Sequence, residues 1–229
     1  FNEMINENNV MVSDTALKAA QQADAILVLT EWEEFTELNW KNIFEVMRKP
    51  AWIFDSRICL EKESLKDIGF HDEIEETKIT LEGNALLKAR HIYNKYKCNC
   101  FADDTGLEID ALNGKPGVYS ARYAGPACNA TDNINKVLRD LDNTENRQAM
   151  FVTVIALIIE GKEYIFKGQC EGTITKKFYG NEGFGYDPIF LPVDSKLTFA
   201  EMNQIEKGKI SHRGIAREKL ISFLEKKKL

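Results

Sequence analysis

The sequence predicts an α/β fold in which a mixed, twisted β-sheet is flanked by helices. Three patterns predict it. Residues 81–96 carry an amphipathic stripe, residues 151–159 form a β-branched apolar run, and residues 25–54 follow the order strand, helix, strand. The chain has 229 residues, of which 44% are hydrophobic. This length suits one large domain or two small ones.

The first 60 residues predict a small βαβ unit. Asp14 is expected to cap a helix that ends near Ala23, because a carboxylate there can accept hydrogen bonds from free backbone N–H groups. Three elements then follow: a strand at 25–29, an amphipathic helix from Phe35 to Met47, and a second strand at 51–54.

Composition marks a boundary near residue 60. All 14 glycines lie at Gly69 or later, whereas all three tryptophans lie at Trp52 or earlier. Such an asymmetry indicates two joined sequence sources. We therefore expect a division into residues 1–60 and residues 61–229.

The larger segment predicts a sheet and its covering helices. Apolar residues recur at helical spacing from Leu81 to Tyr96, and Lys88 lies on a neighbouring face. A short strand from Cys98 to Ala102 leads into Asp103 and its acidic neighbour. The later expected elements are a turn at 113–117, a helix at 131–141, strands at 151–159, 164–166 and 172–175, a loop at 181–188, and a helix from Arg213 to Lys226 with Ser211 as its N-cap.

Composition also narrows the class of protein. The net charge of -6 argues against a protein that coats nucleic acid, which usually carries a basic stripe. No apolar run reaches the roughly 18–20 residues that span a bilayer, and no signal peptide is evident. The five cysteines show no C-x-x-C spacing, as expected of reduced thiols. We expect a cytoplasmic protein without membrane or nucleic-acid partners.

Carboxylates provide the first candidate site. Glu75 and Glu76 lie in one loop, and Asp103 and Asp104 lie at the predicted strand end. Hard oxygen ligands of this kind suit Mg²⁺, which takes one or two carboxylates and bridges substrate phosphates. Because side chains alternate along a strand, only one of the two aspartates should be the principal ligand. A turn with a solvated acidic pair is the alternative.

Two further segments could contact a nucleotide. The loop from Gly183 to Asp187 offers Phe184 or Tyr186 as a face for a base, although a β-turn with core aromatics is the alternative. Residues 207–213 place basic side chains at a helix start, where anions are favoured. Cations normally favour the opposite helix end, so this placement indicates function. Lys88 alone could equally be a solvated charge.

Two family resemblances follow from these motifs. The stretches ADAILVLTEWEEF and KPAWIFDSR resemble the UDP-sugar-binding, C-terminal domain of UDP-glucose dehydrogenases. The first 60 residues contain no glycine for a dinucleotide turn, so dehydrogenase activity is not expected. From residue 64 onward, EETKITLEGNALLKA, FADDTGLEIDALNGKPGVYSARYAG, GFGYDPIF and KISHRG resemble the noncanonical purine nucleoside triphosphate pyrophosphatases, the inosine/xanthosine triphosphatase family.

The second resemblance implies a reaction and a site. The reaction is Mg²⁺-dependent hydrolysis of ITP, dITP or XTP to monophosphate and pyrophosphate. Asp104 corresponds to the general base and a metal ligand, and Glu75 to the companion metal ligand. The residues implied in substrate binding are Lys88, Thr105, Phe184, Gly185, Tyr186, Asp187, Lys207, His212 and Arg213. A homodimer that pairs through a surface including residues 119–123 is also implied.

The sequence departs from this family at its start. The family begins with a strand and a T-x-N-x-x-K loop that holds the triphosphate, whereas residues 29–34 here read LTEWEE. Gly83 also replaces a glutamate more usual in the family. We hypothesise that residues 26–29 take the vacant central strand position without restoring the phosphate site. Three readings stay open: a pyrophosphatase with full or reduced activity, a non-catalytic nucleotide-binding protein, and a chimeric product with an inert first segment.

Overall fold

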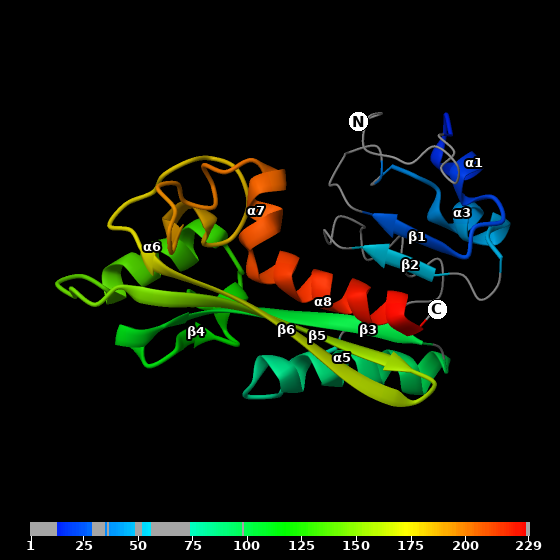
Figure 1. The fold of residues 1–229 in the computed structure, drawn as a ribbon, viewed down its shortest axis with the longest axis horizontal. Helices are drawn as coiled ribbons and strands as arrows, with labels where there is room; N and C mark the ends of the chain where they lie inside the picture. The colour runs from blue at the N-terminus through cyan, green and yellow to red at the C-terminus, as the bar shows by residue number, and fades with distance from the viewer. Residues whose placement is uncertain are drawn as a thin grey trace. The chain divides into compact units, whose positions relative to one another are not determined.

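The computed structural model describes residues 13–28, 35, 37–48, 52–55, 74–97 and 99–227. The chain divides into two compact units, residues Phe1–Glu73 and Ile74–Leu229 (Figure 1). The boundary expected near residue 60 falls within residues 56–73, outside the described residues. No helix in the described part of the chain is long and apolar enough to cross a membrane.

The described residues of the first unit include two short helices, α1 (Ala16–Ala20) and α3 (Trp40–Val46), and a pair of parallel strands. The two helices share a small core in which Ala20, Trp40, Ile43 and Met47 are buried. The N-cap of α1 is Thr15, whose hydroxyl accepts a hydrogen bond from the Lys18 amide at 3.3 Å. The expected cap, Asp14, instead forms an exposed ion pair with the Lys18 ammonium, because its side chain reaches along the helix surface.

The strands of this unit do not join the larger sheet. Strand β1 (Ala25–Val28) pairs in parallel with β2 (Trp52–Asp55), and the two form a sheet of their own. Among the described strands, the expected placement of residues 26–29 in the central sheet is therefore wrong. The strand–helix–strand order favours local parallel pairing of β1 with β2, because a crossover helix returns the second strand beside the first.

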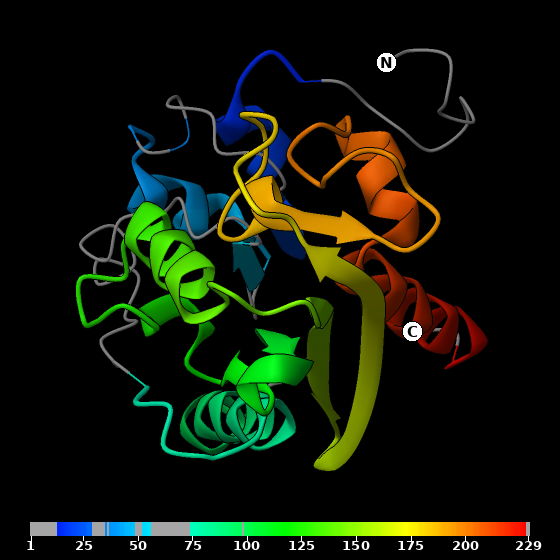
Figure 2. The same cartoon turned by 90° about the vertical axis from the view of Figure 1, so that its left-hand side faces the viewer.

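The second unit is built on a five-stranded antiparallel sheet of order β4-β3-β5-β6-β7. Helix α5 (Leu81–Tyr96) covers one face of the long strands, and α8 (His212–Lys227) covers the other (Figures 1 and 2). The predicted α/β architecture, a sheet flanked by helices, is confirmed. A mixed sheet was expected, whereas all described pairings within this sheet are antiparallel. The strands are β3 (Cys100–Ile109), β4 (Lys115–Gly117), β5 (Gln148–Ile159), β6 (Lys162–Ile174) and β7 (Phe190–Pro192). The other helices are α6 (Ala130–Asp140), α7 (Gln204–Ile210) and the short 3₁₀ helices η1 (Asp110–Leu112), η2 (Ser120–Arg122) and η3 (Asp187–Ile189).

Two strands are longer than their sequence signals predicted. Strand β3 does not end before Asp103 but continues through both aspartates to Ile109, paired residue by residue with β5. Strand β6 is continuous where two shorter strands were expected, because it pairs with β5 from Lys162 to Thr173. Cross-strand hydrogen bonds outweigh the turn preference of the glycines in this segment.

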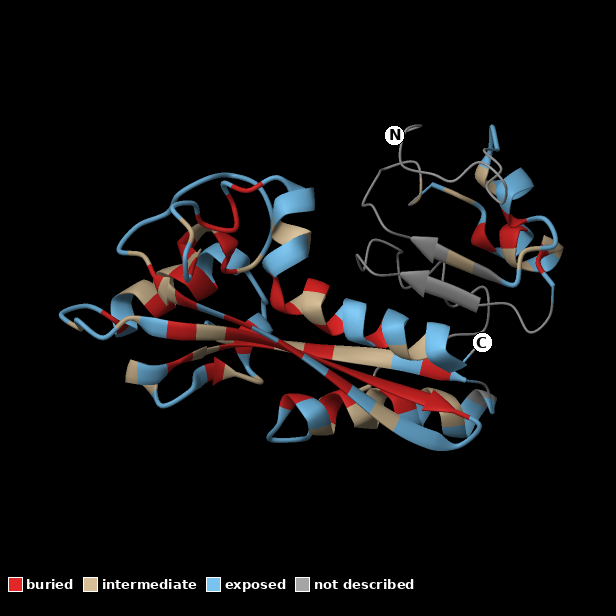
Figure 3. Ribbon diagram, viewed as in Figure 1, coloured by how far each residue is buried: buried red, intermediate tan, exposed pale blue. Residues whose placement is uncertain are grey.

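Strand β5 is buried on both faces, which explains its unbroken apolar run (Figure 3). On the α8 side, Ile155 and Leu157 cluster with Ala216 and Leu220. Gly168 of β6 allows this close approach of α8, since a Cβ at that position would lie 2.0 Å from the His212 carbonyl oxygen. The sheet therefore fixes the position of the first turn of α8.

Candidate active site

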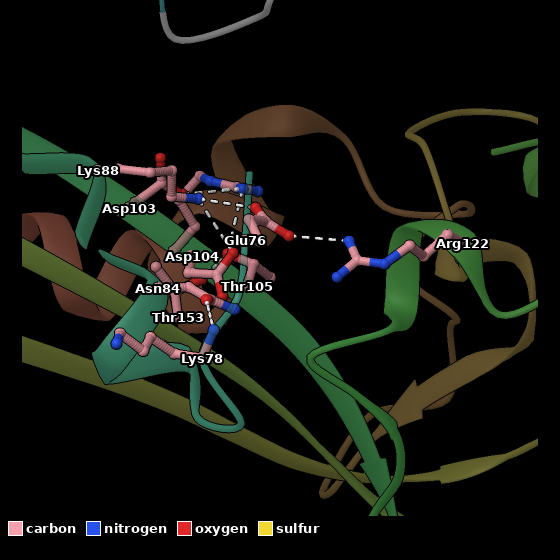
Figure 4. A network of polar contacts seen from close by, with 10 residues as sticks. Glu76, Lys78, Asn84, Lys88, Asp103, Asp104, Thr105, Arg122 and Thr153 are labelled. Atoms are coloured by element: carbon pink, nitrogen blue, oxygen red, sulfur yellow. Dashed lines mark hydrogen bonds and ion pairs between the residues drawn. The ribbon is translucent and has the colours of Figure 1, made fainter. Parts of the chain in front are cut away.

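A chain of alternating charges connects α5, β3 and η2 (Figure 4). Lys88 Nζ donates to Asp104 Oδ1 and to Glu76 Oε1, each at 3.1 Å. Arg122 Nη1 donates to the other oxygen of Glu76, Oε2, at 2.9 Å. We call Glu76, Lys88, Asp104 and Arg122 the carboxylate cluster. Lys88 is therefore a partly buried member of an ion-pair network and not the solvated charge of the alternative reading.

The helix α5 positions Lys88 through its own sequence. Thr80 caps the helix by accepting a hydrogen bond from the Gly83 amide at 3.0 Å. Asn84, one turn before Lys88, is fully buried, and its Oδ1 accepts a hydrogen bond from the Lys78 amide at 2.9 Å. This contact ties the segment that carries Glu76 to the start of α5.

Burial and charge tune the groups of the carboxylate cluster. Burial raises the pKa of Asp104, and the neighbouring Lys88 opposes this without reversing it. Burial would also raise the pKa of Glu76, but hydrogen bonds and charges from Arg122 and Lys88 outweigh it and the pKa is lowered. For Lys88, burial is outweighed by Asp104 and Glu76, so its pKa is raised and it stays charged. A carboxylate with a raised pKa beside a fixed cation suits a general base.

The cluster has the donor set of a divalent-cation site. Asp104 Oδ2 is buried and has no hydrogen-bond partner of ordinary geometry in the described part of the chain, although the nearby Asn84 side chain lowers the pKa of Asp104. A carboxylate oxygen in that state, with a second carboxylate on Glu76 nearby, fits Mg²⁺. The described residues contain no cluster of three or more such ligands. Mg²⁺ needs only one or two carboxylates when water and substrate phosphates supply the rest.

Of the two adjacent glutamates at 75 and 76, the structure brings the second into the carboxylate cluster. Glu76, and not Glu75, contacts Lys88, while Glu75 is exposed. Adjacent side chains of a non-helical segment point in different directions, and the sequence contained no signal to choose between them. Arg122 was also missed, because an arginine in a loop has no spacing that connects it to a glutamate 46 positions earlier.

A second group of side chains lies on the opposite face of β3. Arg213 Nη2 donates to Thr105 Oγ1 at 3.2 Å and to Asp103 Oδ2 at 3.3 Å. Its guanidinium lies 5.4 Å from the centre of the Phe184 ring, and Lys207 Nζ lies 5.0 Å from the same ring. We call Thr105, Phe184, Lys207 and Arg213 the aromatic cluster. The prediction that Asp103 and Asp104 face opposite ways is confirmed.

The loop from Gly183 to Asp187, here called the aromatic loop, has one ring at the surface and one in the core. Phe184 is 54% exposed, whereas Tyr186 is buried and donates a hydrogen bond to the Ser120 carbonyl at 2.8 Å. Only Phe184 of this pair can offer a free face to a base. Asp187 braces the loop, because it accepts a hydrogen bond from the Phe184 amide at 2.7 Å and pairs with Lys207. Gly185, with φ +59°, provides the left-handed turn between the rings.

The histidine at the start of α8 is part of the core. His212 stacks on Phe151 with ring centres 4.4 Å apart and planes inclined by 14°. Burial, followed by the charges of Arg213 and Lys207, lowers the pKa of His212 to about 3. The imidazole is therefore neutral near pH 7 and can act on a base only as a neutral hydrogen-bonding group. Ser211 caps α8 as predicted, since its hydroxyl accepts from the Gly214 amide at 3.1 Å.

Separate from both clusters, a cavity of about 250 Å³ lies between α6 and the end of β6. Its lining residues are Leu138, Leu141, Asp142, Asn143, Thr144, Glu145, Arg147 and Lys176. Arg147 is used structurally there, because its guanidinium donates to the carbonyl oxygens of Leu141, Ile174 and Thr175. The cavity contains none of the predicted site residues.

Comparison with known proteins adds a family to this geometry. Residues 37–223 match the model of the Ham1 family, and residues 2–62 match that of the UDP-glucose/GDP-mannose dehydrogenase family, UDP binding domain. A dITP/XTP pyrophosphatase of Flavobacterium psychrophilum is 54% identical over 162 residues, which cover 71% of this chain and 85% of that protein. The corresponding protein of Flavobacterium johnsoniae is 56% identical over 161 residues, which cover 70% of this chain and 84% of that protein.

Solved structures agree with the sequence relatives. The Staphylococcus aureus Ham1 protein superposes with a TM-score of 0.70 at 37% identity, covering 89% of this chain and 99% of its own. A HAM1 protein from Coxiella burnetii gives a TM-score of 0.68 at 34% identity, covering 88% and 98%. The family match spans the carboxylate cluster and the aromatic cluster. This chain therefore belongs to the Ham1 family.

Proposed function

We propose that the protein is a Mg²⁺-dependent pyrophosphohydrolase of noncanonical purine nucleoside triphosphates, acting on ITP, dITP and XTP. Relatives at about half identity are named dITP/XTP pyrophosphatases, which supports a nucleoside triphosphate pyrophosphohydrolase. The observation that carries the proposal is the contact of Lys88 with a buried Asp104 whose second oxygen has no hydrogen-bond partner of ordinary geometry among the described residues.

The carboxylate cluster supplies the hydrolytic chemistry. Asp104 orients a water molecule and accepts its proton as the water oxygen attacks the α-phosphorus. The bond from this phosphorus to the bridging oxygen of the β-phosphate breaks, which releases pyrophosphate. Lys88 places a fixed positive charge where negative charge accumulates on the phosphates. Asp104 and Glu76 are the residues that would hold Mg²⁺, and the adjacent Glu75, proposed from the sequence, is the other candidate ligand. The ion would neutralise phosphate charge when bound.

The aromatic cluster supplies the choice of base. Phe184 offers an exposed ring on which a purine can stack, worth roughly 1–3 kcal/mol. Arg213 and Lys207 present N–H donors beside that ring. The 6-oxo group of hypoxanthine or xanthine accepts such donors, whereas the 6-amino group of adenine leaves two donors facing each other. The cluster therefore favours the oxidised bases.

The start of the chain is the reason to consider a second function. The first 60 residues contain no T-x-N-x-x-K loop, and the segment with three acidic residues at positions 31–34 lies outside the described residues. Loss of one lysine–phosphate contact would remove several kcal/mol of transition-state stabilisation. A protein that binds the nucleotide without hydrolysing it is thus the alternative. We propose residues 1–60 as the dehydrogenase-like segment and residues 61–229 as the pyrophosphatase domain.

Pyrophosphate release from ITP, XTP and ATP with Mg²⁺ tests the proposal. We expect hydrolysis of ITP and XTP well above that of ATP, and its loss in Asp104→Asn. ITP binding without pyrophosphate release by the wild-type protein would favour the alternative function, and neither binding nor release would overturn both. Replacing residues 1–60 with the family's amino-terminal strand and loop should raise turnover if the present segment is the defect.

A further inference from the structure

We infer that Arg122 is a positioning residue that holds Glu76 in the orientation required for metal binding. The inference deepens the proposed function and rests on it for the identity of the metal. It is carried by the position of Glu76 in the chain: residues 74–79 form neither helix nor strand, so the backbone alone does not fix this carboxylate.

Two cations from different elements orient Glu76. Lys88 of α5 contacts Oε1 at 3.1 Å, and Arg122 of η2 contacts Oε2 at 2.9 Å. Lys88 is shared with Asp104 and must also meet the substrate phosphates in the proposed reaction. Arg122 contacts neither Asp104 nor Lys88, so its ion pair with Glu76 can persist while Lys88 engages a phosphate.

Hydrogen bonds to β3, β4 and α6 hold the short helix η2 that carries Arg122, and we call this helix the support of Arg122. Within η2, the buried Ser120 accepts a hydrogen bond from the Leu107 amide at 2.9 Å and donates one to the Gly117 carbonyl at 2.6 Å. The next residue, Ala121, accepts from Asn133 of α6 at 2.8 Å. An arginine held in this way can fix the orientation of a carboxylate that lies outside helices and strands.

The support also carries the aromatic loop. The hydroxyl of Tyr186 donates to the Ser120 carbonyl, two residues before Arg122. One short helix therefore contacts both the loop beside Phe184 and the carboxylate of Glu76. In the proposed site, η2 thus contacts both the loop that would bind the base and the carboxylate cluster that would bind the phosphates.

Metal affinity distinguishes positioning from a simple charge effect, because the two predict opposite changes in affinity when Arg122 is removed. If Arg122 acted only as a nearby positive charge, its removal would strengthen cation binding. If it positions Glu76, its removal weakens cation binding, and partners that orient metal ligands typically contribute roughly 10–100-fold in affinity. The direction of the change is thus decisive.

The test measures Mn²⁺ binding to the full chain without nucleotide. Electron paramagnetic resonance reports the concentration of the free ion during the titration. Mn²⁺ accepts the same oxygen ligands as Mg²⁺. We expect Arg122→Met to weaken binding by about 10–100-fold, and Arg122→Lys to give an intermediate value. Arg90→Met is the matched control, since Arg90 forms an exposed ion pair with Glu163 outside the carboxylate cluster. It should leave Mn²⁺ affinity unchanged.

Two further measurements separate positioning from general damage. Hydrogen exchange should accelerate in residues 74–79 of Arg122→Met and stay unchanged in β5. In a double-mutant cycle, Arg122→Met should weaken Mn²⁺ binding little further once Glu76→Gln is present. Tighter or equal Mn²⁺ binding by Arg122→Met would overturn the inference, as would absence of Mn²⁺ binding by the wild type. Both outcomes are independent of whether ITP is hydrolysed.

Discussion

Asp103 and Asp104 are neighbours in β3 but contact opposite layers of the molecule. Asp104 accepts a hydrogen bond from Lys88 of α5, and Asp103 pairs with Arg213 of α8. One strand thus joins the carboxylate cluster to the aromatic cluster. A displacement of β3 would move both together, so the two clusters keep their spacing.

Replacement of Lys88 by methionine should reduce kcat/KM by about 10²–10³-fold, the loss typical of removing one group that stabilises transition-state charge. The pH profile should also change. Lys88 lowers the pKa of Asp104 against the effect of burial, so its removal raises that pKa. The proposed reaction needs the ionised aspartate. The acid limb of the pH–rate profile should therefore move to higher pH in Lys88→Met.

The control for this variant is Lys136→Met, which removes an ion pair with Asp140 on α6. Its rate and pH profile should match those of the wild type. An unchanged acid limb in Lys88→Met would contradict the assignment of Asp104 as the titrating base.

Replacement of Phe184 by alanine should weaken ITP binding by about 1–3 kcal/mol, the usual worth of stacking a base on an aromatic ring. The melting temperature should stay nearly constant because the ring is 54% exposed. Affinity is best measured in the Asp104→Asn background, where hydrolysis does not interfere. Val193→Ala, at another exposed apolar position, is the comparison variant. Equal ITP affinity in the two variants would exclude Phe184 as the stacking surface.

His212 should make stability depend on pH below neutrality. Its pKa is about 3 in the folded protein and near 6.5 in the unfolded chain, so between these values only the unfolded chain binds the proton. The free energy of unfolding should therefore decrease as pH falls through this window, by up to about 1.4 kcal/mol per pH unit. Urea unfolding between pH 7.5 and 5.0 measures the slope. His212→Phe should show a shallower slope, and equal slopes would contradict the buried neutral histidine.

Replacement of Gly168 by alanine should destabilise the second unit by about 1–3 kcal/mol or more, as expected for overpacking. The added Cβ would lie 2.0 Å from the His212 carbonyl oxygen and 2.5 Å from the Ala216 amide nitrogen, both backbone atoms of α8. Gly208→Ala in α7 is the control, since its Cβ would meet no atom within 4 Å and alanine favours a helix by about 1 kcal/mol. Thermal unfolding of the two variants should shift in opposite directions.

Local patterns in the sequence were sufficient for the main elements of the second unit. The stripe from Leu81 to Tyr96 forms α5, and the apolar run at 151–159 forms most of β5, because burial periodicity is a property of neighbouring residues. The opposite orientation of Asp103 and Asp104 followed from strand geometry in the same way. The lengths of the strands were harder to predict from the sequence, since the extent of β3 and β6 depends on pairing with β5.

The sequence by itself thus determined the residue types of the site and the order of the elements that carry them, as well as the family to which the second segment belongs. Only the tertiary structure decided that Glu76 and not Glu75 contacts Lys88, that Tyr186 is buried while Phe184 is exposed, and that Arg122 reaches the carboxylate. The physical reason is distance along the chain. Residues far apart in sequence interact only once the sheet has brought them together, and no local periodicity encodes which of two adjacent side chains will meet a partner.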